Sequence, residues 1–142
     1  MAPTTKTTGG CLCGAVRYAV HGSLRPVVFC HCEQCRKTSG HFVAASACAS
    51  QDLELIENDK LRWYQSSPQA QRGFCCDCGG NLFWRPVSGA HVSIMAGTID
   101  LPTGITAIAH IYVGSASDYH EIDDKLPQYT KGCTEDLGAG DQ

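Results

Sequence analysis

The chain has 142 residues and a mass of 15.2 kDa, which is the size of one ordinary domain. Hydrophobic residues make up 43% and charged residues 18%, a composition typical of a globular protein and unlike that of a disordered or membrane protein. The formal net charge of -3 gives no electrostatic reason to bind nucleic acid or an anionic membrane, so neither is an expected partner.

The two ends of the chain are polar and are expected to be disordered. Residues 1–8 are rich in Thr, and residues 133–142 are acidic and contain several Gly. The beginning has no apolar segment of the kind that a secretory signal needs, and no run approaches the roughly 18 apolar residues of a membrane helix. We therefore expect a cytoplasmic protein with one domain over residues 9–132, whose cysteines stay reduced.

The body of the chain predicts many short strands. Between residues 14 and 20, Val16, Tyr18 and Val20 recur with the two-residue period of a half-buried strand. Similar segments follow, separated by turn-forming residues, at 27–29, 41–47, 53–56, 61–64, 71–74, 81–84, 91–95 and 107–113. Apolar residues keep a helical period nowhere for long, so any helix is short, and residues 33–39 are the best place for one. The sequence therefore predicts an all-β domain with at most short helical turns.

Ten cysteines are the unusual feature of this composition. Seven of them lie in three tight groups, which are Cys11 and Cys13, then Cys30, Cys32 and Cys35, then Cys75 and Cys78. Sulfurs separated by one or two residues can point at one ion about 2.3 Å away, whereas such close neighbours are badly placed for a disulfide. The spacing therefore predicts metal binding. Cys48, Cys76 and Cys133 have no partner at this spacing and are expected to be packing or surface thiols.

Counting ligands divides the grouped cysteines between two sites. A closed tetrahedral zinc site needs four ligands, which the first and last groups supply together. That site would join segments about 65 residues apart, so its binding energy would be folding energy. The middle group would hold a second ion with one position open to water or substrate, which is the pattern of catalytic zinc. A single site that combines the middle group with Cys75 or Cys78 is the alternative that spacing leaves open.

The cysteine groups are embedded in longer motifs that occur in a recognisable order. The motifs are Gly10-Cys11-Leu12-Cys13-Gly14-Ala15-Val16-Arg17-Tyr18, then Cys30-His31-Cys32-Glu33-Gln34-Cys35-Arg36-Lys37, then Phe74-Cys75-Cys76-Asp77-Cys78-Gly79-Gly80-Asn81-Leu82. Gly97-Thr98-Ile99-Asp100, His110-Ile111-Tyr112-Val113 and the segment 122–129 follow them. Over about residues 9–132, this pattern resembles the glutathione-dependent formaldehyde-activating enzymes, a family grouped with the centromere protein V domain.

The resemblance implies a fold and two metal sites. The fold would be a single β-rich domain like that of the Mss4 zinc proteins. There would be two zinc ions per chain, a structural ion on Cys11, Cys13, Cys75 and Cys78 and a catalytic ion on Cys30, Cys32 and Cys35, in agreement with the ligand count. One departure is Tyr119, since Trp often follows the His-Ile motif in the family, and this departure suggests a changed substrate pocket.

The reaction that the resemblance implies is the formation or cleavage of the carbon–sulfur bond of S-(hydroxymethyl)glutathione, or of another thiol adduct of a small aldehyde or electrophile. The expected partner is a small thiol or thiol adduct, with glutathione as one candidate. Arg36 and Lys37 could offset the net charge of about -1 that three thiolates leave on zinc, hold a substrate carboxylate, or simply face solvent. His110 is a candidate acid or base, with a core histidine as the alternative.

The alternative function is a non-catalytic zinc module that binds protein or chromatin. A chromatin-binding module is expected to carry a basic patch or tail, whereas the last residues of this chain are acidic. The sequence therefore favours a zinc-dependent carbon–sulfur lyase.

Overall fold

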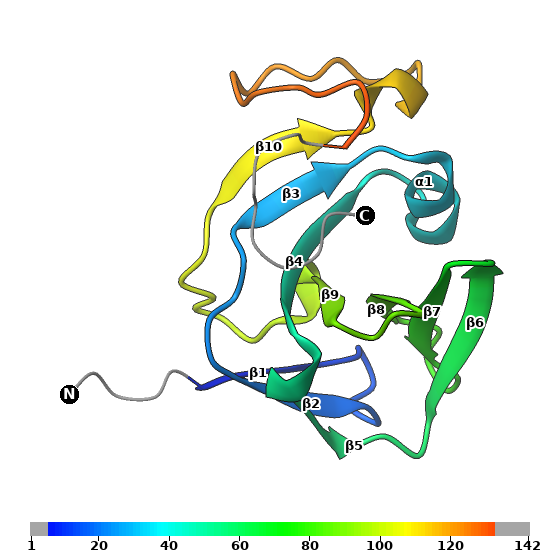
Figure 1. Ribbon diagram of the computed structural model, residues 1–142, viewed down its shortest axis with the longest axis vertical. Coiled ribbons are helices and arrows are strands. Elements are labelled where there is room, and N and C mark those ends of the chain that lie inside the picture. Colours follow the sequence, from blue (N-terminus) through cyan, green and yellow to red (C-terminus); the bar gives the residue numbers. More distant parts are fainter. Residues whose placement is uncertain (1–5, 133–142) are drawn as a thin grey trace.

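Two β-sheets of unequal size make up the protein, which is described from a computed structural model over residues 6–132. The smaller sheet has the order β1-β2-β5, with β1 at Lys6–Gly10, β2 at Arg17–His21 and β5 at Leu53–Glu57. The larger sheet has the order β10-β3-β4-β9-β8-β7-β6 (Figure 1). Its strands are β3 at Val27–Cys30, β4 at Val43–Ala49, β6 at Leu61–Ser67, β7 at Ala70–Cys75, β8 at Asn81–Pro86, β9 at His91–Met95 and β10 at Ala107–Ile111. The all-β prediction is confirmed.

Helical structure is short, as the sequence predicted. Helix α1 covers Glu33–Ser39, the predicted range, and begins after Cys32, whose sulfur accepts a hydrogen bond from the Cys35 N–H. The other helices are short 3-10 turns, η1 at Ser50–Asp52, η2 at Ala96–Thr98 and η3 at Val113–Ser115. Within residues 6–132, no helix has the length and hydropathy needed to cross a membrane.

The prediction of a disordered beginning is wrong for residues 6–8, which belong to β1. This strand has no apolar alternation, but it pairs antiparallel with β2 from Lys6 opposite His21 to Gly10 opposite Arg17. Backbone pairing rather than side-chain burial therefore specifies it. The remainder of the predicted disordered ends, residues 1–5 and 133–142, lies outside the described residues, as does Cys133.

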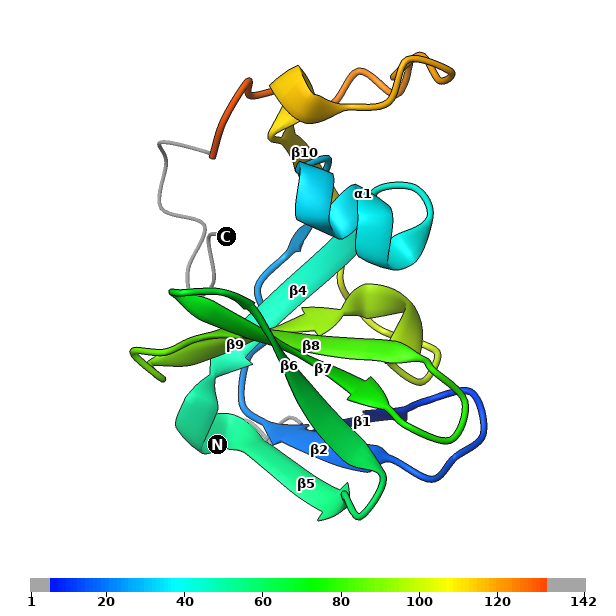
Figure 2. The same cartoon turned by 90° about the vertical axis from the view of Figure 1, so that its right-hand side faces the viewer.

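The apolar core has two parts, and each borders one cysteine group. The first lies around Tyr18, Phe83 and Leu82, and it includes Cys11 and Cys75. The second lies between α1 and strands β3, β4 and β10, and it includes Cys30 and Cys35. Figure 2 places the β1-β2-β5 sheet at one end of the molecule, below strands β6 to β9, and α1 with β10 at the other end. The two cysteine groups are thus built into different parts of the fold.

Candidate metal centres

The first and last cysteine groups lie together in the structure. The sulfur atoms of Cys11, Cys13, Cys75 and Cys78 are all within 4.8 Å of one another. The Cys13 sulfur is 3.7 Å from the Cys11 sulfur and 3.7 Å from the Cys75 sulfur. Four thiolates about 2.3 Å from one ion at tetrahedral angles would be about 3.8 Å apart, so this set fits zinc. Cys75 and Cys78 thus join Cys11 and Cys13 rather than the middle group.

Tight turns that end on glycine position these four sulfurs. The Gly14 N–H donates to the Cys11 carbonyl at 3.2 Å, and the Gly79 N–H donates to the Cys75 carbonyl at 2.7 Å. Both glycines have a positive φ, of 82° and 74°, which other residues adopt only with strain. One turn joins β1 to β2 and the other joins β7 to β8. A metal ion here would connect the small sheet to the large one.

The middle group is formed where β3 runs into α1. Cys30 is the last residue of β3, Cys32 caps the helix, and Cys35 lies in its first turn. Their sulfurs are also within 4.8 Å of one another. Cys30 and Cys35 are buried, whereas Cys32 is partly exposed. Hydrogen bonds with the Cys30 and Cys35 side chains lower the pKa of Cys32, while the same contacts raise the pKa of Cys30, so negative charge in this group is favoured on the partly exposed sulfur.

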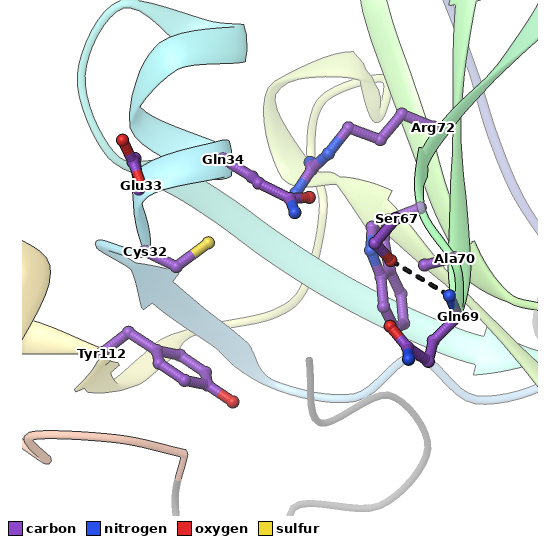
Figure 3. Close-up of a pocket in the computed structure, with 9 residues that line it drawn as sticks. Cys32, Glu33, Gln34, Ser67, Gln69, Ala70, Arg72 and Tyr112 are labelled. Carbon is purple, nitrogen blue, oxygen red and sulfur yellow. Dashed lines mark hydrogen bonds between the residues drawn. The ribbon is translucent and has the colours of Figure 1, made fainter.

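A cavity of about 460 Å³ opens beside Cys32. Its lining comes from the start of α1, from strands β6 to β8 and from the segment after β10, and consists of Cys32, Glu33, Gln34, Ser67, Gln69, Ala70, Arg72, Trp84 and Tyr112. Figure 3 shows the Cys32 sulfur and the Tyr112 ring pointing toward Ser67 and Gln69 across this space. The three-cysteine group therefore has one side that a small ligand can reach, and its volume is that of a small-molecule site.

Arg72 is the buried cation of this site that the sequence analysis missed. It lies on β7 with 3% of its surface exposed, and its Nη2 donates a hydrogen bond to the Cys35 sulfur at 3.6 Å. Its positive charge favours the thiolate forms of Cys32 and Cys35, as a smaller contribution beside the contacts among the three cysteines. Strand alternation places Arg72 on the same face of β7 as Ala70, but only the structure shows that this face is buried, so the sequence offers a weak signal at most.

Arg36 and Lys37, the cations expected at this site, do not line the cavity. Lys37 is exposed on α1, with its ammonium 3.9 Å from the Glu33 carboxylate. Arg36 lies one residue earlier in the last turn of the helix and is partly buried. The roles suggested for both residues stay predictions.

His110 lies away from the cavity, on β10, and is 2% exposed. Its Nδ1 is 2.8 Å from Nε2 of His31, and its Nε2 is 2.7 Å from Oδ2 of Asp124. Burial, with a smaller contribution from the nearby histidines, lowers the pKa of His31 to about 4, so this ring is neutral at pH 7. The structure thus joins His110 to the loop between Cys30 and Cys32, and a direct role in proton transfer stays a prediction.

Tyr112 and Tyr119 have different positions relative to the cavity. Tyr119 is 66% exposed and its hydroxyl is 2.7 Å from Nδ1 of His41, so the departure at this residue does not alter the cavity wall. The strand predicted to reach residue 113 ends at Ile111, because Tyr112 adopts a left-handed backbone with φ 56° and ψ 37°. Such conformations are uncommon in residues other than glycine and cluster at functional sites.

Comparisons with known proteins give the family and the relatives of this chain. The model of the family described as "Glutathione-dependent formaldehyde-activating enzyme" matches residues 6–115. A protein of Schizosaccharomyces pombe named as an uncharacterized lyase is 28% identical over 123 residues, which cover 86% of this chain and 89% of that protein. A crystal structure of a Rhodobacter sphaeroides protein is similar with a TM-score of 0.57 and 23% identity, over 70% of this chain and 97% of that one. This last likeness concerns the fold alone.

Proposed function

We propose, because this chain belongs to the glutathione-dependent formaldehyde-activating enzyme family, that it forms or cleaves the carbon–sulfur bond between a thiol and a small aldehyde. The lyase name of the Schizosaccharomyces pombe relative supports an enzyme of the lyase kind. The observation that carries the proposal is the asymmetry of the two cysteine groups. One group has four sulfurs, while the other has three and borders a cavity of about 460 Å³.

The donor sets fit zinc in both groups. Cys11, Cys13, Cys75 and Cys78 would complete a tetrahedral shell and hold a structural ion. Cys30, Cys32 and Cys35 would hold an ion with one position left for a ligand in the cavity. Zinc bound there would supply a site that keeps a thiol ionised near neutral pH and polarises an aldehyde or hemithioacetal oxygen.

The bond changes of the reaction balance without any oxidant or reductant. In the forward direction, the thiol sulfur attacks the aldehyde carbon, a carbon–sulfur bond forms and the carbonyl π bond opens. The proton that leaves the thiol ends on the new hydroxyl oxygen. The reverse reaction breaks the carbon–sulfur bond and returns the proton to sulfur. The protein therefore has to orient two small reactants and stabilise charge, which a three-thiolate site beside a cavity supports.

Arg72 and the cavity wall have separate tasks in this proposal. The buried guanidinium of Arg72, 3.6 Å from the Cys35 sulfur, offsets the excess negative charge that three thiolates would leave on a zinc ion. The hydroxyl of Tyr112 and the polar side chains of Ser67 and Gln69 supply hydrogen-bond partners for the substrate oxygen. Trp84 supplies an apolar surface against which a small carbon skeleton can pack.

The test uses formaldehyde and glutathione, which combine to a hemithioacetal. NMR exchange spectroscopy measures the rate at which the free reactants and this adduct interconvert. The uncatalysed exchange is appreciable, so wild type is compared with Cys32→Ser and with Cys76→Ser at equal concentration. Cys76 is exposed and belongs to neither group, which makes its replacement a matched control. We expect wild type and Cys76→Ser to accelerate exchange, and Cys32→Ser to give the uncatalysed rate.

A panel of other thiols and aldehydes extends the test beyond glutathione. Acceleration with any member that disappears in Cys32→Ser supports the proposal. If no member is turned over, while the intact protein with its metal captures a defined protein partner, the non-catalytic binding module replaces the enzyme.

A further inference from the structure

Most of the hydrogen-bonding capacity of Arg72 is unused. Its Nη2 donates to the Cys35 sulfur, but Nε and Nη1 are buried and have no hydrogen-bond partner among residues 6–132. The ion pairs of the described residues do not include Arg72. Buried donors of a charged group are almost always paired, because leaving them unpaired is costly. The guanidinium is therefore arranged for an acceptor that residues 6–132 do not supply.

Arg72 faces the cavity beside Cys32. Figure 3 shows its side chain extending from β7 toward Gln34 of α1, and the Gln34 side chain extending toward it from the helix. Gln34 is exposed, so its side chain can turn into solvent at little cost and admit a ligand to the guanidinium. The neighbouring Ser67 and Gln69 are uncharged. Glu33 is the one carboxylate that residues 6–132 contribute to the lining, and its exposed side chain lies 3.9 Å from the Lys37 ammonium, which offsets its charge toward an incoming anion.

We propose that Arg72 is an anion-binding residue of this cavity, and that the substrate carries a carboxylate within a few bonds of its reacting sulfur or carbon. The inference rests on the proposed function, since it concerns the substrate of the same site. The bond to Cys35 uses one of the five N–H donors of the guanidinium, so a fork of parallel donors remains for two carboxylate oxygens. A fork of this kind recognises a carboxylate better than a single point charge does.

The short distances limit the size of the substrate. Nη2 of Arg72 is 3.6 Å from the Cys35 sulfur, and that sulfur is within 4.8 Å of the Cys32 sulfur that borders the cavity. A group bound at the open side of the three cysteines and a carboxylate bound to Arg72 are therefore close neighbours. A small thiol acid, or the adduct of a thiol with an aldehyde acid, matches this separation. In glutathione, both carboxylates are farther from the sulfur along the chain of bonds.

Two thiols that differ in one group test the inference. Mercaptoacetate and 2-mercaptoethanol have similar size, but only the first has a carboxylate. Binding of each to the zinc-loaded full chain is measured by titration calorimetry at physiological ionic strength. We expect wild type to prefer mercaptoacetate by about tenfold or more, the range of a charge-assisted hydrogen bond. In Arg72→Gln the two thiols should bind within about twofold of each other.

Control variants distinguish the loss of the paired N–H donors of Arg72 from the loss of a positive charge and from a failure to fold. Arg62 is exposed on β6, so Arg62→Gln removes the same charge and should keep the wild-type preference. If Arg72→Gln does not fold, Arg72→Lys keeps a cation near Cys35 but loses the fork. We expect Arg72→Lys to reduce the preference at least about threefold. An unchanged preference in a folded Arg72 variant would overturn the inference.

A second measurement needs no thiol and no turnover. Acetate is titrated into ¹⁵N-labelled protein, and the side-chain Nε–H resonance of Arg72 is identified by its loss in Arg72→Lys. A saturable shift of this resonance supports the anion site. Equal binding of both thiols without such a shift overturns the inference and leaves the proposed function standing. Failure of both thiols to bind, together with an acetate-dependent shift, overturns the proposed function and keeps the anion site.

Discussion

His31 and His110 are joined by a short contact of 2.8 Å between Nε2 of the first ring and Nδ1 of the second. Asp124 extends this series of hydrogen-bonded side chains, with its Oδ2 2.7 Å from Nε2 of His110. A carboxylate only accepts hydrogen bonds, so His110 donates from Nε2, and its neutral form accepts at Nδ1 from His31. Because His31 lies between Cys30 and Cys32, this chain of hydrogen bonds fixes the loop that carries two of the three sulfurs.

Replacement of His110 by Ala is expected to lower stability. The change leaves Nε2 of His31 buried without its partner and removes the ring that packs against Phe29 at 4.9 Å. We expect the free energy of unfolding, measured in urea, to fall by about 2–3 kcal/mol. Asp124→Asn should lower stability less than His110→Ala does, because Asp124 is exposed.

The same variant decides between two roles for His110. Since His110 does not line the cavity, the pH dependence of turnover in His110→Ala should keep the wild-type shape even where the rate falls. A pH profile that loses one limb, without a loss of stability, would instead support His110 as the acid or base.

Variants of the two cysteine groups should fail in different ways. Cys13→Ser or Cys78→Ser removes a ligand from the group that connects the two sheets, so we expect insoluble or unfolded protein. Cys32→Ser changes the partly exposed member of the other group and should leave a folded chain that has lost one metal ion. Circular dichroism and thermal melting measure the difference, with Cys76→Ser as the control. Equal loss of folding in all ligand variants would contradict separate roles.

Local sequence patterns predicted most of the secondary structure, because strand alternation and helix capping involve residues that are close together in the sequence. Two-residue alternation gave β2, and the sulfur cap of Cys32 with Gly40 after the helix fits the bounds of α1. β1 was missed because its residues, Lys6–Gly10, have no apolar alternation. Its partner β2 specifies it through backbone pairing, and a contact between separate strands leaves no pattern within either one.

The cysteine groups were predictable for the same reason, since chelating sulfurs lie within a few residues of each other. The rest of the cavity comes from distant segments. Arg72 is 37 residues from Cys35, and it reaches that sulfur only because β7 and α1 lie on the same side of the fold. Tyr112 reaches the cavity because its backbone is left-handed, a conformation that tyrosine rarely adopts. The residue type therefore did not predict this turn.

Protein purified without added metal is expected to contain close to two zinc ions per chain, because both cysteine groups fit the ion. Elemental analysis by mass spectrometry measures the content. A chelator should remove the ion of the three-cysteine group first, with little change in melting temperature, because three ligands hold less firmly than four. Removal of the second ion should then unfold the protein. A content well below one, or iron in place of zinc, would contradict this assignment.

Tyr18 predicts how stability changes at alkaline pH. Its side chain is fully buried, and its hydroxyl is 2.7 Å from Oγ1 of Thr98. Burial raises the pKa of Tyr18 from its ordinary value of 10.0 to about 12. The folded state therefore holds this proton more tightly than the unfolded state does. The stabilisation is complete below pH 10.0 and is lost as the pH rises toward about 12.

The comparison of wild type with Tyr18→Phe isolates this contribution. The variant loses the hydrogen bond to Thr98, so its free energy of unfolding at neutral pH should be about 1 kcal/mol lower. Above pH 10.0 the variant has no phenol to ionise, so its stability should fall less steeply than that of wild type. Cys48, whose pKa burial also raises to about 12, titrates in both proteins and cancels in the comparison. Denaturant titrations at intervals up to about pH 12 measure the free energy of unfolding of both proteins as a function of pH. Parallel curves would contradict the prediction, because they would show that the pKa of Tyr18 is the same in the folded and unfolded states.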